Sequence, residues 1–208
     1  MNTLKHNINQ ILFALKNHLS SQDRHMIAIA GAPASGKSTI AEALVKRMNL
    51  EGMSSALMPM DGFHLDNSIL EARGRLQRKG APDTFDVKSL ISFIERMHRG
   101  ETVIAPSFDR SIDQSIASAI KVSSGIDWIV VEGNYLLLED EPWNKLYSYF
   151  DLTVFLTIDE HELRARLMQR WLSYGFNEQD AKIKIEQNDI QNARHIMRHS
   201  IPAMITLS

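Results

Sequence analysis

The feature that most constrains the fold of this chain is a glycine-rich segment, Gly31 to Ser38, with the pattern G-x-x-x-x-G-K-S. The residues before it, His25 to Ala30, form a short apolar run that is typical of a buried β-strand, and those after it, Thr39 to Met48, favour a helix. Glycines in such a loop let backbone N–H groups curl around phosphate oxygens without clashes from Cβ atoms. A strand, a glycine loop and a helix in this order therefore predict a phosphate-binding site.

The side chains of this loop have distinct predicted tasks. Lys37 is expected to reach the β- and γ-phosphates of a nucleotide and to act in catalysis, and the Ser38 hydroxyl is expected to ligate Mg²⁺. The start of the following helix adds partial positive charge. The alternative is a glycine-rich turn beside a surface lysine, which the flanking strand and helix disfavour. The predicted nucleotide-binding residues are Gly31, Ala32, Pro33, Ala34, Ser35, Gly36, Lys37, Ser38 and Thr39.

The length and composition of the chain bound its function. Its 208 residues suffice for one α/β domain, so we expect residues 1–208 to form a single domain. The formal net charge of -2 implies no general attraction to nucleic acid or to anionic lipid. The chain has no cysteine, which excludes disulfides, cysteine-based zinc sites and a thiol nucleophile. We expect a cytoplasmic protein with a small-molecule substrate and without a nucleic-acid or membrane partner, and the composition leaves a homodimer open.

Apolar runs of strand character alternate with helical patterns along the chain. Strands are expected at His25–Ala30, Ser55–Met60, Ile126–Val131, Asp151–Ile158 and Ala203–Leu207. An amphipathic helix is expected within residues 1–22, and further helices are expected at Thr39–Asn49, Val87–His98, Glu160–Ser173 and Glu178–Ile190. This alternation predicts a parallel sheet with helices on both faces. Ligands of such folds bind beyond the carboxyl ends of the strands, so the residues that follow each strand are the functional candidates.

Acidic residues follow two of the predicted strands. Asp61 comes after the second strand, where its carboxylate can accept the proton of an attacking hydroxyl during phosphoryl transfer. The alternative is that Asp61 and Gly62 simply form a turn. Glu132 ends the third strand, and a carboxylate beside a phosphate loop suggests a ligand of the metal or its water, or a group that orients the nucleophile. The alternative for Glu132 is a carboxylate that caps the next turn.

Basic residues are candidates for binding phosphate groups. Arg166 and Arg170 share one face of a predicted helix, and two guanidinium groups on one face can close over a triphosphate. The alternative for this pair is a solvated face shared with Glu162. Arg78 and Lys79 end a basic stretch within a charged, turn-rich loop, which either binds an anionic group or is solvated.

Two further candidates lie beside the segments already described. Arg110 follows the strand-like residues 102–105. His64 is singled out by its position three residues after Asp61.

Several of these segments resemble the P-loop kinase family that contains uridine kinase, phosphoribulokinase and bacterial pantothenate kinase. The resemblance runs from about His25 to the C-terminus and rests on Met60-Asp61-Gly62-Phe63-His64, Ala81-Pro82-Asp83-Thr84-Phe85-Asp86, Pro106-Ser107-Phe108-Asp109, Val131-Glu132-Gly133 and Arg166-Leu167-Met168-Gln169-Arg170. The longer strings Asp61–Asp66, Arg78–Asp86 and Glu132–Leu137 resemble a compact subgroup described as fructokinase-like or uridine-kinase-like.

The resemblance implies a P-loop NTPase fold with a five-stranded parallel sheet, a substrate loop over residues 61–86 and a helical lid over residues 160–175. It also implies that ATP is the phosphoryl donor, that Asp61 is the base, and that Lys37, Glu132 and the lid arginines act with it. The residues expected to contact the substrate are His64, Arg78, Lys79, Phe108 and Arg110, and those expected to hold Mg²⁺ are Ser38 and Glu132.

The sequence thus predicts an ATP-dependent kinase that transfers the γ-phosphoryl group to a hydroxyl of a small metabolite, with a sugar as the first choice. A nucleoside or pantothenate is the alternative acceptor, although uridine kinases carry a His-Ser-Arg string where this chain has Arg110-Ser111-Ile112. A P-loop NTP hydrolase or a nucleotide-binding regulator is the alternative class. The chain has neither the Asn-Lys-x-Asp motif of GTPases nor the Leu-Ser-Gly-Gly-Gln signature of transport ATPases.

Overall fold

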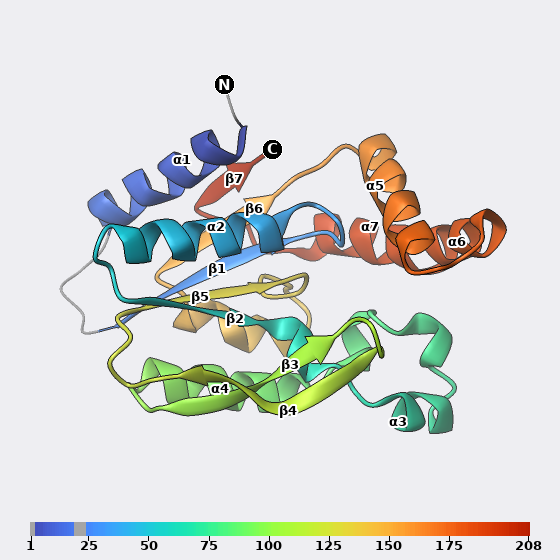
Figure 1. Cartoon of the computed structure of the whole chain (residues 1–208), viewed down its shortest axis with the longest axis horizontal. Coiled ribbons are helices and arrows are strands. Elements are labelled where there is room, and N and C mark those ends of the chain that lie inside the picture. The colour runs from blue at the N-terminus through green and yellow to red at the C-terminus, as the bar shows by residue number, and fades with distance from the viewer. Residues whose placement is uncertain (1–2, 19–23) are drawn as a thin grey trace.

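The computed structural model describes residues 3–18 and 24–208. The described residues form a five-stranded sheet with helices on both faces and a separate two-stranded hairpin (Figure 1). The strands of the main sheet, in spatial order, are β2 (Ser55–Pro59), β5 (Trp128–Gly133), β1 (His25–Gly31), β6 (Leu152–Leu156) and β7 (Ile205–Leu207). All of these pairings are parallel, so the predicted fold class is confirmed.

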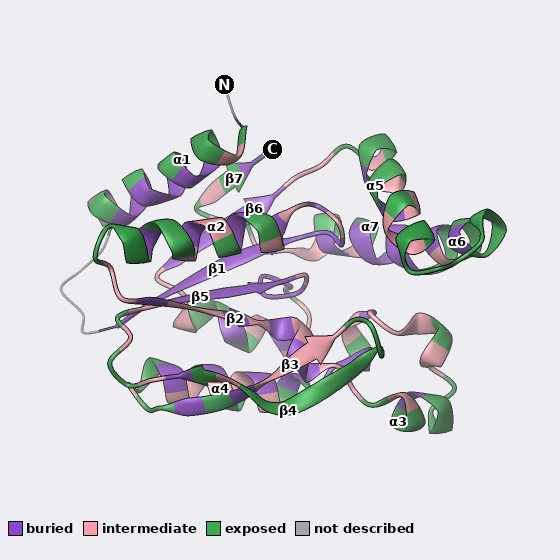
Figure 2. Cartoon of the chain, in the orientation of Figure 1, coloured by how far each residue is buried: buried purple, intermediate pink, exposed green. Residues whose placement is uncertain are grey.

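The central strands are buried on both faces, which explains their apolar composition. Every residue of β1 and of β6 is buried, as the purple ribbons of Figure 2 show. One face is covered by α1 (Thr3–His18) and α2 (Lys37–Leu50). The other face is covered by α4 (Val87–His98), by the short helix η4 (Trp143–Tyr149) and by the end of α7 (Ile190–His199). Residues 1–2 and 19–22 of the expected N-terminal helix lie outside the described residues.

A group of helices after β6 stands beside the carboxyl ends of the strands (Figure 1). It begins with α5 (Glu160–Ser173), and α6 (Glu178–Lys184) runs through a π-helical turn, η5 (Ile185–Asp189), into α7. The expected helix Glu178–Ile190 therefore continues to His199, because Ala193 and Ile196 extend its apolar face. We call α5, α6, η5 and α7 the lid helices.

Short elements occupy the segment expected to be a substrate loop. They are η1 (Met60–Phe63), α3 (Asn67–Ala72), η2 (Leu76–Arg78) and η3 (Pro82–Thr84). The strand-like residues 102–105 belong to a longer strand, β3 (Val103–Asp109), which pairs antiparallel with β4 (Gln114–Val122). The sequence does not predict β4, because most of its residues are exposed, as Figure 2 shows, and it has no apolar run. No described helix is long and apolar enough to cross a membrane.

Candidate active site

The glycine loop between β1 and α2 adopts a geometry that requires its glycines. Gly31 has φ 154°, and a Cβ atom there would lie 2.8 Å from the carbonyl oxygen of Leu156. Gly36 has φ 99° and immediately precedes α2, so the backbone turns directly into the N-terminus of that helix. Because residues with a side chain rarely adopt such a φ, replacement of Gly36 would strain the loop. The first N–H groups of α2 therefore point toward the space that a phosphate group occupies in such loops.

Lys37 and Glu132 are buried together beneath this loop. Lys37 is 8% exposed and forms no ion pair with the described residues; burial lowers its pKa, while nearby Glu132 opposes that shift. Glu132 is 4% exposed, and burial raises its pKa although Lys37 opposes the shift. Its Oε2 atom is buried and has no hydrogen-bond partner among the described residues. An unpartnered carboxylate oxygen beside the Ser38 hydroxyl suits a hard cation or its water.

Asp61 lies in η1, directly after β2, and its side chain is 18% exposed. Its Oδ2 atom accepts a hydrogen bond of 2.6 Å from Nη2 of Arg110. Burial disfavours the ionised form of Asp61, but His64 and Arg110 outweigh burial and hold its pKa below its usual value. Asp61 is therefore a carboxylate at neutral pH, as a proton acceptor must be.

A glycine follows each of the two acidic residues and allows a neighbouring segment to approach closely. A Cβ atom on Gly133 would lie 2.0 Å from Met60, the residue before Asp61. A Cβ atom on Gly62 would lie 2.2 Å from the carbonyl oxygen of Pro106 in β3. The glycine after each carboxylate thus lets η1 pack directly on β5 and on the hairpin.

A cavity of about 490 Å³ opens in front of Lys37 and Asp61. It lies between the glycine loop, the residues after β2, the β3–β4 hairpin and the lid helices. Its polar and aromatic lining includes Asn67, Asn134, Asn192, Trp171, Tyr174 and Phe176.

Three of the predicted substrate residues form one wall of this cavity. The ring of His64 stacks between Phe85 and Phe108, at centroid distances of 4.0 and 4.5 Å. Burial lowers the pKa of His64, so its ring is neutral at pH 7. The Nζ atom of Lys79 lies 5.0 Å from the centroid of the Phe108 ring and 2.9 Å from Oδ2 of Asp113. The positive charge of Lys79 is thus already met by a carboxylate.

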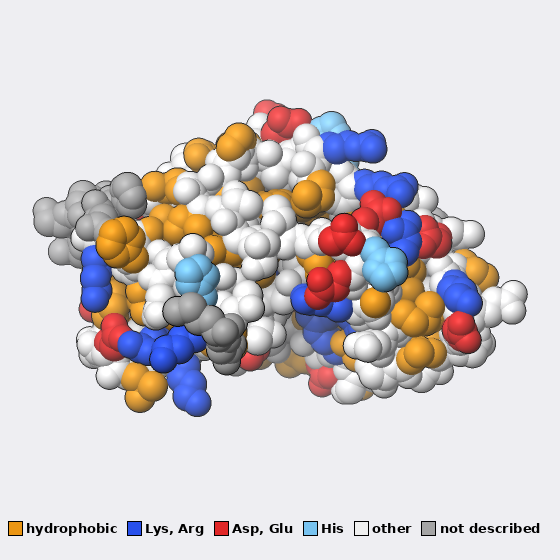
Figure 3. Space-filling model, turned by 90° about the horizontal axis from the view of Figure 1, so that it is seen from above, with side chains coloured by type: hydrophobic (Ala, Val, Ile, Leu, Met, Phe, Trp, Pro, Cys, Tyr) orange, Lys and Arg blue, Asp and Glu red, His pale blue; other side chains and the backbone are white. Residues whose placement is uncertain are grey.

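The two predicted lid arginines differ in their contacts. Nη1 of Arg166 donates to the carbonyl oxygen of Ser35 at 3.2 Å, while its Nη2 atom pairs with Glu162, the residue of the alternative interpretation. Arg170 lines the cavity, and its buried Nε atom has no hydrogen-bond partner among the described residues. Arg164 instead pairs with Glu160 and Glu186 at the α5 end of the molecule, where Figure 3 shows acidic and basic side chains intermixed.

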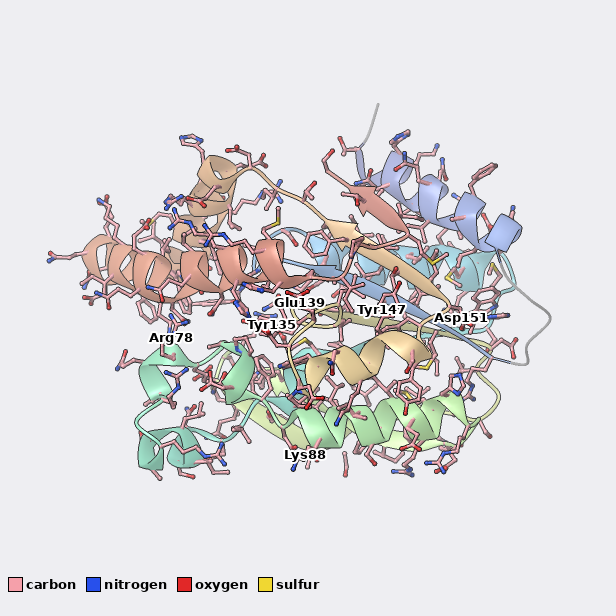
Figure 4. All side chains as sticks on the ribbon, turned by 180° about the vertical axis from the view of Figure 1, so that it is seen from behind. Arg78, Lys88, Tyr135, Glu139, Tyr147 and Asp151 are labelled. Atoms are coloured by element: carbon pink, nitrogen blue, oxygen red, sulfur yellow. The ribbon has the colours of Figure 1, made fainter. Side chains whose placement is uncertain are left out.

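Arg78 does not line the cavity, unlike the other predicted substrate residues. Its guanidinium group donates to the backbone oxygen of Gln187, to Oε1 of Gln191 and to Oδ1 of Asn192. Figure 4 shows Arg78 reaching from η2 to the lid helices. Sequence reasoning assigned Arg78 to the substrate because a basic loop carries no sign of a partner more than a hundred residues away.

Sequence reasoning also missed several residues that line the cavity. They are Asn67, Asp113, Asn134, Trp171, Tyr174, Phe176, Lys184, Asp189 and Asn192. Asn67, Asp113, Asn134 and Trp171 carried a usable signal, because each lies within three residues of a residue already singled out. The others belong to helices or their ends, where a polar or aromatic residue looks like ordinary surface.

The loop, the buried lysine, the two carboxylates and the lid arginines together define a P-loop phosphotransferase. The model of the phosphoribulokinase/uridine kinase family matches residues 26–192. The chain belongs to this family and is an ATP-dependent kinase.

Individual relatives differ in the acceptor that their names state. A crystal structure from Silicibacter sp. TM1040, provisionally named a fructose transport system kinase, is similar with a TM-score of 0.91 and 38% identity over 100% of both chains. A Schizosaccharomyces pombe protein, provisionally named a uridine kinase, is 31% identical over 199 residues, which cover 91% of this chain and 85% of the relative. The pantothenate kinase of Streptococcus equi subsp. zooepidemicus is 28% identical over 152 residues, or 71% of this chain and 49% of the relative.

Proposed function

We propose that this kinase transfers the γ-phosphoryl group of ATP to a hydroxyl of a neutral sugar or polyol. The observation that carries the proposal is the charge balance of the acceptor half of the cavity, by which we mean its lining outside the glycine loop and Arg170. The charged groups there are three basic and three acidic residues, namely Lys79, Arg110, Lys184, Asp61, Asp113 and Asp189. An anionic acceptor would meet no net positive charge there, whereas hydroxyl groups can donate to the carboxylates and amides.

The nucleotide half has the opposite character, because the charged residues that line it, Lys37 and Arg170, are both basic. Two cations there suit a triphosphate, and Arg166, which is paired with Glu162, contacts the glycine loop beside them. In the proposed reaction Asp61 accepts the proton of the acceptor hydroxyl, and Lys37 binds oxygens of the transferring phosphoryl group. The rings of His64 and Phe108, tilted by 37° to one another, provide an aromatic wall for the carbon face of a sugar.

Ser38 and Glu132 would hold Mg²⁺ at this site. The unpartnered, buried Oε2 atom of Glu132 supports this assignment, since a lone carboxylate oxygen is costly to bury without a cation, donor or water. An Mg²⁺ ion held by these two residues would supply positive charge against the charge that develops on the transferring phosphoryl group.

The relatives' names are consistent with more than one acceptor. The name of the Silicibacter relative agrees with a sugar, whereas the names of the yeast and streptococcal relatives point to a nucleoside and to pantothenate. Pantothenate is an acid, and the balanced charges of the acceptor half argue against it. A nucleoside is neutral and remains the second candidate, favoured by the aromatic wall of His64 and Phe108.

The test is an acceptor panel with purified protein and Mg-ATP, in which ADP release is measured with each compound alone. Neutral hexoses and pentoses, linear polyols, nucleosides, pantothenate and glycerate form the panel. We expect a neutral sugar or polyol to raise ADP release above the acceptor-free rate, and Lys37→Ala to lower that rate by about 10²–10³-fold. Turnover with nucleosides or acids alone would refute the sugar assignment, and ADP release that no acceptor stimulates would indicate an NTP hydrolase.

A further inference from the structure

Asp189 is a buried carboxylate on the lid side of the cavity, on a different element from η1, which carries Asp61. It is the last residue of the π-helical turn η5, it is 6% exposed, and it lines the cavity. A π-helical turn widens the helix locally and is found often at functional sites. Neither the phosphate-binding loop nor the proposed base accounts for an acidic side chain at this position.

The hydrogen bonds of Asp189 leave much of its capacity unused. Its Oδ2 atom accepts the indole N–H of Trp171 at 2.6 Å. Its Oδ1 atom accepts no hydrogen bond from any residue of the described ranges 3–18 and 24–208. An ionised carboxyl group can accept about four hydrogen bonds. Its Oδ1 atom is therefore free to accept from water or from a group that enters the cavity.

The turn that carries Asp189 is fixed to the segment that carries Lys79. Arg78 donates to the backbone oxygen of Gln187 and to Oδ1 of Asn192, and Nδ2 of Asn188 donates to the backbone oxygen of Lys79 at 2.9 Å. We call these bonds the latch.

Tyr135 supports the same segment from the strand side of the cavity. Its hydroxyl donates to the backbone oxygen of Gly80 at 2.5 Å. Figure 4 labels Arg78 and Tyr135 at the two ends of this arrangement. Asp189 and Lys79 are thus held in a fixed relation, as a specificity site requires.

We propose that Asp189 binds the acceptor by accepting hydrogen bonds from its hydroxyl groups and so selects neutral polyhydroxy acceptors over anionic ones. This inference rests on the proposed function. A carboxylate at the lid wall attracts hydroxyl donors and repels carboxylate or phosphate groups on an acceptor. Lys184 and Arg170 lie near enough to influence Asp189, but neither is within ion-pair distance, so its charge remains available to the acceptor.

The test compares Asp189→Asn with the wild type and with Glu186→Gln. Glu186 lies in the same turn but pairs with Arg164 outside the cavity, so its variant removes the same charge from the same element. KM for the neutral acceptor, KM for ATP and kcat are measured for each protein. We expect Asp189→Asn to raise the acceptor KM about 10–100-fold, the value of a hydrogen bond to a charged group, and to change KM for ATP less than about 2-fold. Glu186→Gln should leave all three constants within about 2-fold.

The selectivity of the variant is a second readout, which a merely structural role would not move. The readout is the ratio of kcat/KM for the neutral acceptor to kcat/KM for an acidic analogue, such as the aldonic acid of the preferred sugar. We expect Asp189→Asn to lower this ratio by about 10-fold or more. Asp189→Glu keeps the charge and should keep the preference for neutral acceptors. Melting temperatures of all variants exclude misfolding as the cause.

Failure of the inference and failure of the proposed function give different results. If the wild type phosphorylates neutral acceptors and Asp189→Asn has an unchanged acceptor KM and selectivity, the role of Asp189 is refuted and the proposed function stands. If the wild type phosphorylates only acidic acceptors, the sugar assignment is refuted and the role of Asp189 fails with it.

Discussion

Arg110 shapes what Asp61 can do in the proposed mechanism. It donates to Oδ2 of Asp61, whereas Oδ1 accepts no hydrogen bond from the described part of the chain. One oxygen is therefore fixed and the other remains for the acceptor hydroxyl. The ion pair also keeps the carboxyl group ionised in a largely buried position.

Replacement of Asp61 by Asn keeps the size of the side chain but removes the base. We expect kcat for transfer to the acceptor to fall about 10²–10⁴-fold, the usual span for general acid–base catalysis. The nucleotide Kd should be unchanged because the glycine loop is untouched, and acceptor-independent ATP hydrolysis should fall less. Asp83→Asn, which alters an exposed carboxylate paired with Arg75, is the control. An unchanged kcat in Asp61→Asn would refute the role of Asp61 as the base. A loss of both nucleotide binding and stability would instead indicate that Asp61 and Gly62 form a structural turn.

Asp189 should make stability depend on pH in a direction set by its burial. Burial raises its pKa above the usual value of 3.8, so the ionised form costs stability in the folded protein at neutral pH. Asp189→Asn should therefore melt at a higher temperature than the wild type at pH 7.5. The difference should shrink as the pH falls through the raised pKa and disappear below 3.8, because the wild type then takes up a proton. Thermal melts between pH 4 and 8 measure this, and a pH-independent difference would contradict it.

Residues that directly follow strands could be brought together from the sequence, whereas the contacts of Arg78 and Asp189 could not. The glycine loop, Asp61 and Glu132 lie directly after strands, where topology alone brings them to one edge of the sheet. Arg78 and Asp189 depend on which face of a helix meets which loop, and that contact spans more than a hundred residues. Sequence spacing carries no record of such a contact.

At the scale of elements, the lid helices share a small apolar cluster with the glycine loop. Leu163 and Leu167 of α5 and Ile185 of η5 pack together with Ala32. The arginines on α5 are thereby held above the loop by packing as well as by hydrogen bonds. A helix held in this way can close further when phosphate groups bind.

Arg166→Ala and Arg170→Ala should each lower kcat by about 10²-fold or more while weakening nucleotide binding much less, because contacts formed on closure act mainly in the transition state. Arg164→Ala is the matched control, since that arginine lies on the same helix and pairs with Glu160 and Glu186 away from the cavity. Steady-state kinetics and nucleotide titrations distinguish the two effects. If both variants keep the wild-type kcat, these arginines have no catalytic role and simply belong to the solvated face of α5.

The main-sheet strands and the long helices were predictable because their apolar patterns are continuous. The hairpin was only partly predictable, since β4 is exposed along most of its length and the bond between Ser115 and the backbone of His64 joins it to η1. The π-helical turn was not predicted, because one five-residue step in the apolar pattern, from Ile185 to Ile190, is a weak signal beside the regular helical spacing around it. The elements missed are therefore those whose form depends on tertiary contacts.

At the scale of the whole molecule, Arg24 joins parts of the fold that are far apart in sequence. Its buried guanidinium donates to the backbone oxygens of Met97 and Glu101 at the end of α4 and of Ser123, Ser124 and Ile126 before β5. These bonds close the amino ends of the strands, at the side of the sheet opposite the cavity. Arg24 thus supports the fold without contributing to the site.

Replacement of Arg24 by Ala leaves several buried carbonyl groups without a donor. We expect the free energy of unfolding to fall by about 2–4 kcal/mol. Arg24→Lys should recover only part of the loss, because one ammonium group cannot reach all of these acceptors. Chemical denaturation measures the loss, and kcat of the folded variants should stay within about 2-fold of the wild type. A large loss of kcat in a variant that is fully folded would contradict the conclusion that Arg24 supports the fold without contributing to the site.

The latch has a consequence for the order in which a growing chain acquires its parts. The glycine loop rests against Leu156, whereas the acceptor wall needs residues as late as Asn192, which the ribosome adds about 36 residues later. At synthesis rates of about 5–20 residues per second, this interval lasts about 2–7 s. A nascent chain therefore has the strand contact of its nucleotide loop seconds before the lid helices and the acceptor wall are complete, so the two halves of the cavity are acquired in a fixed order.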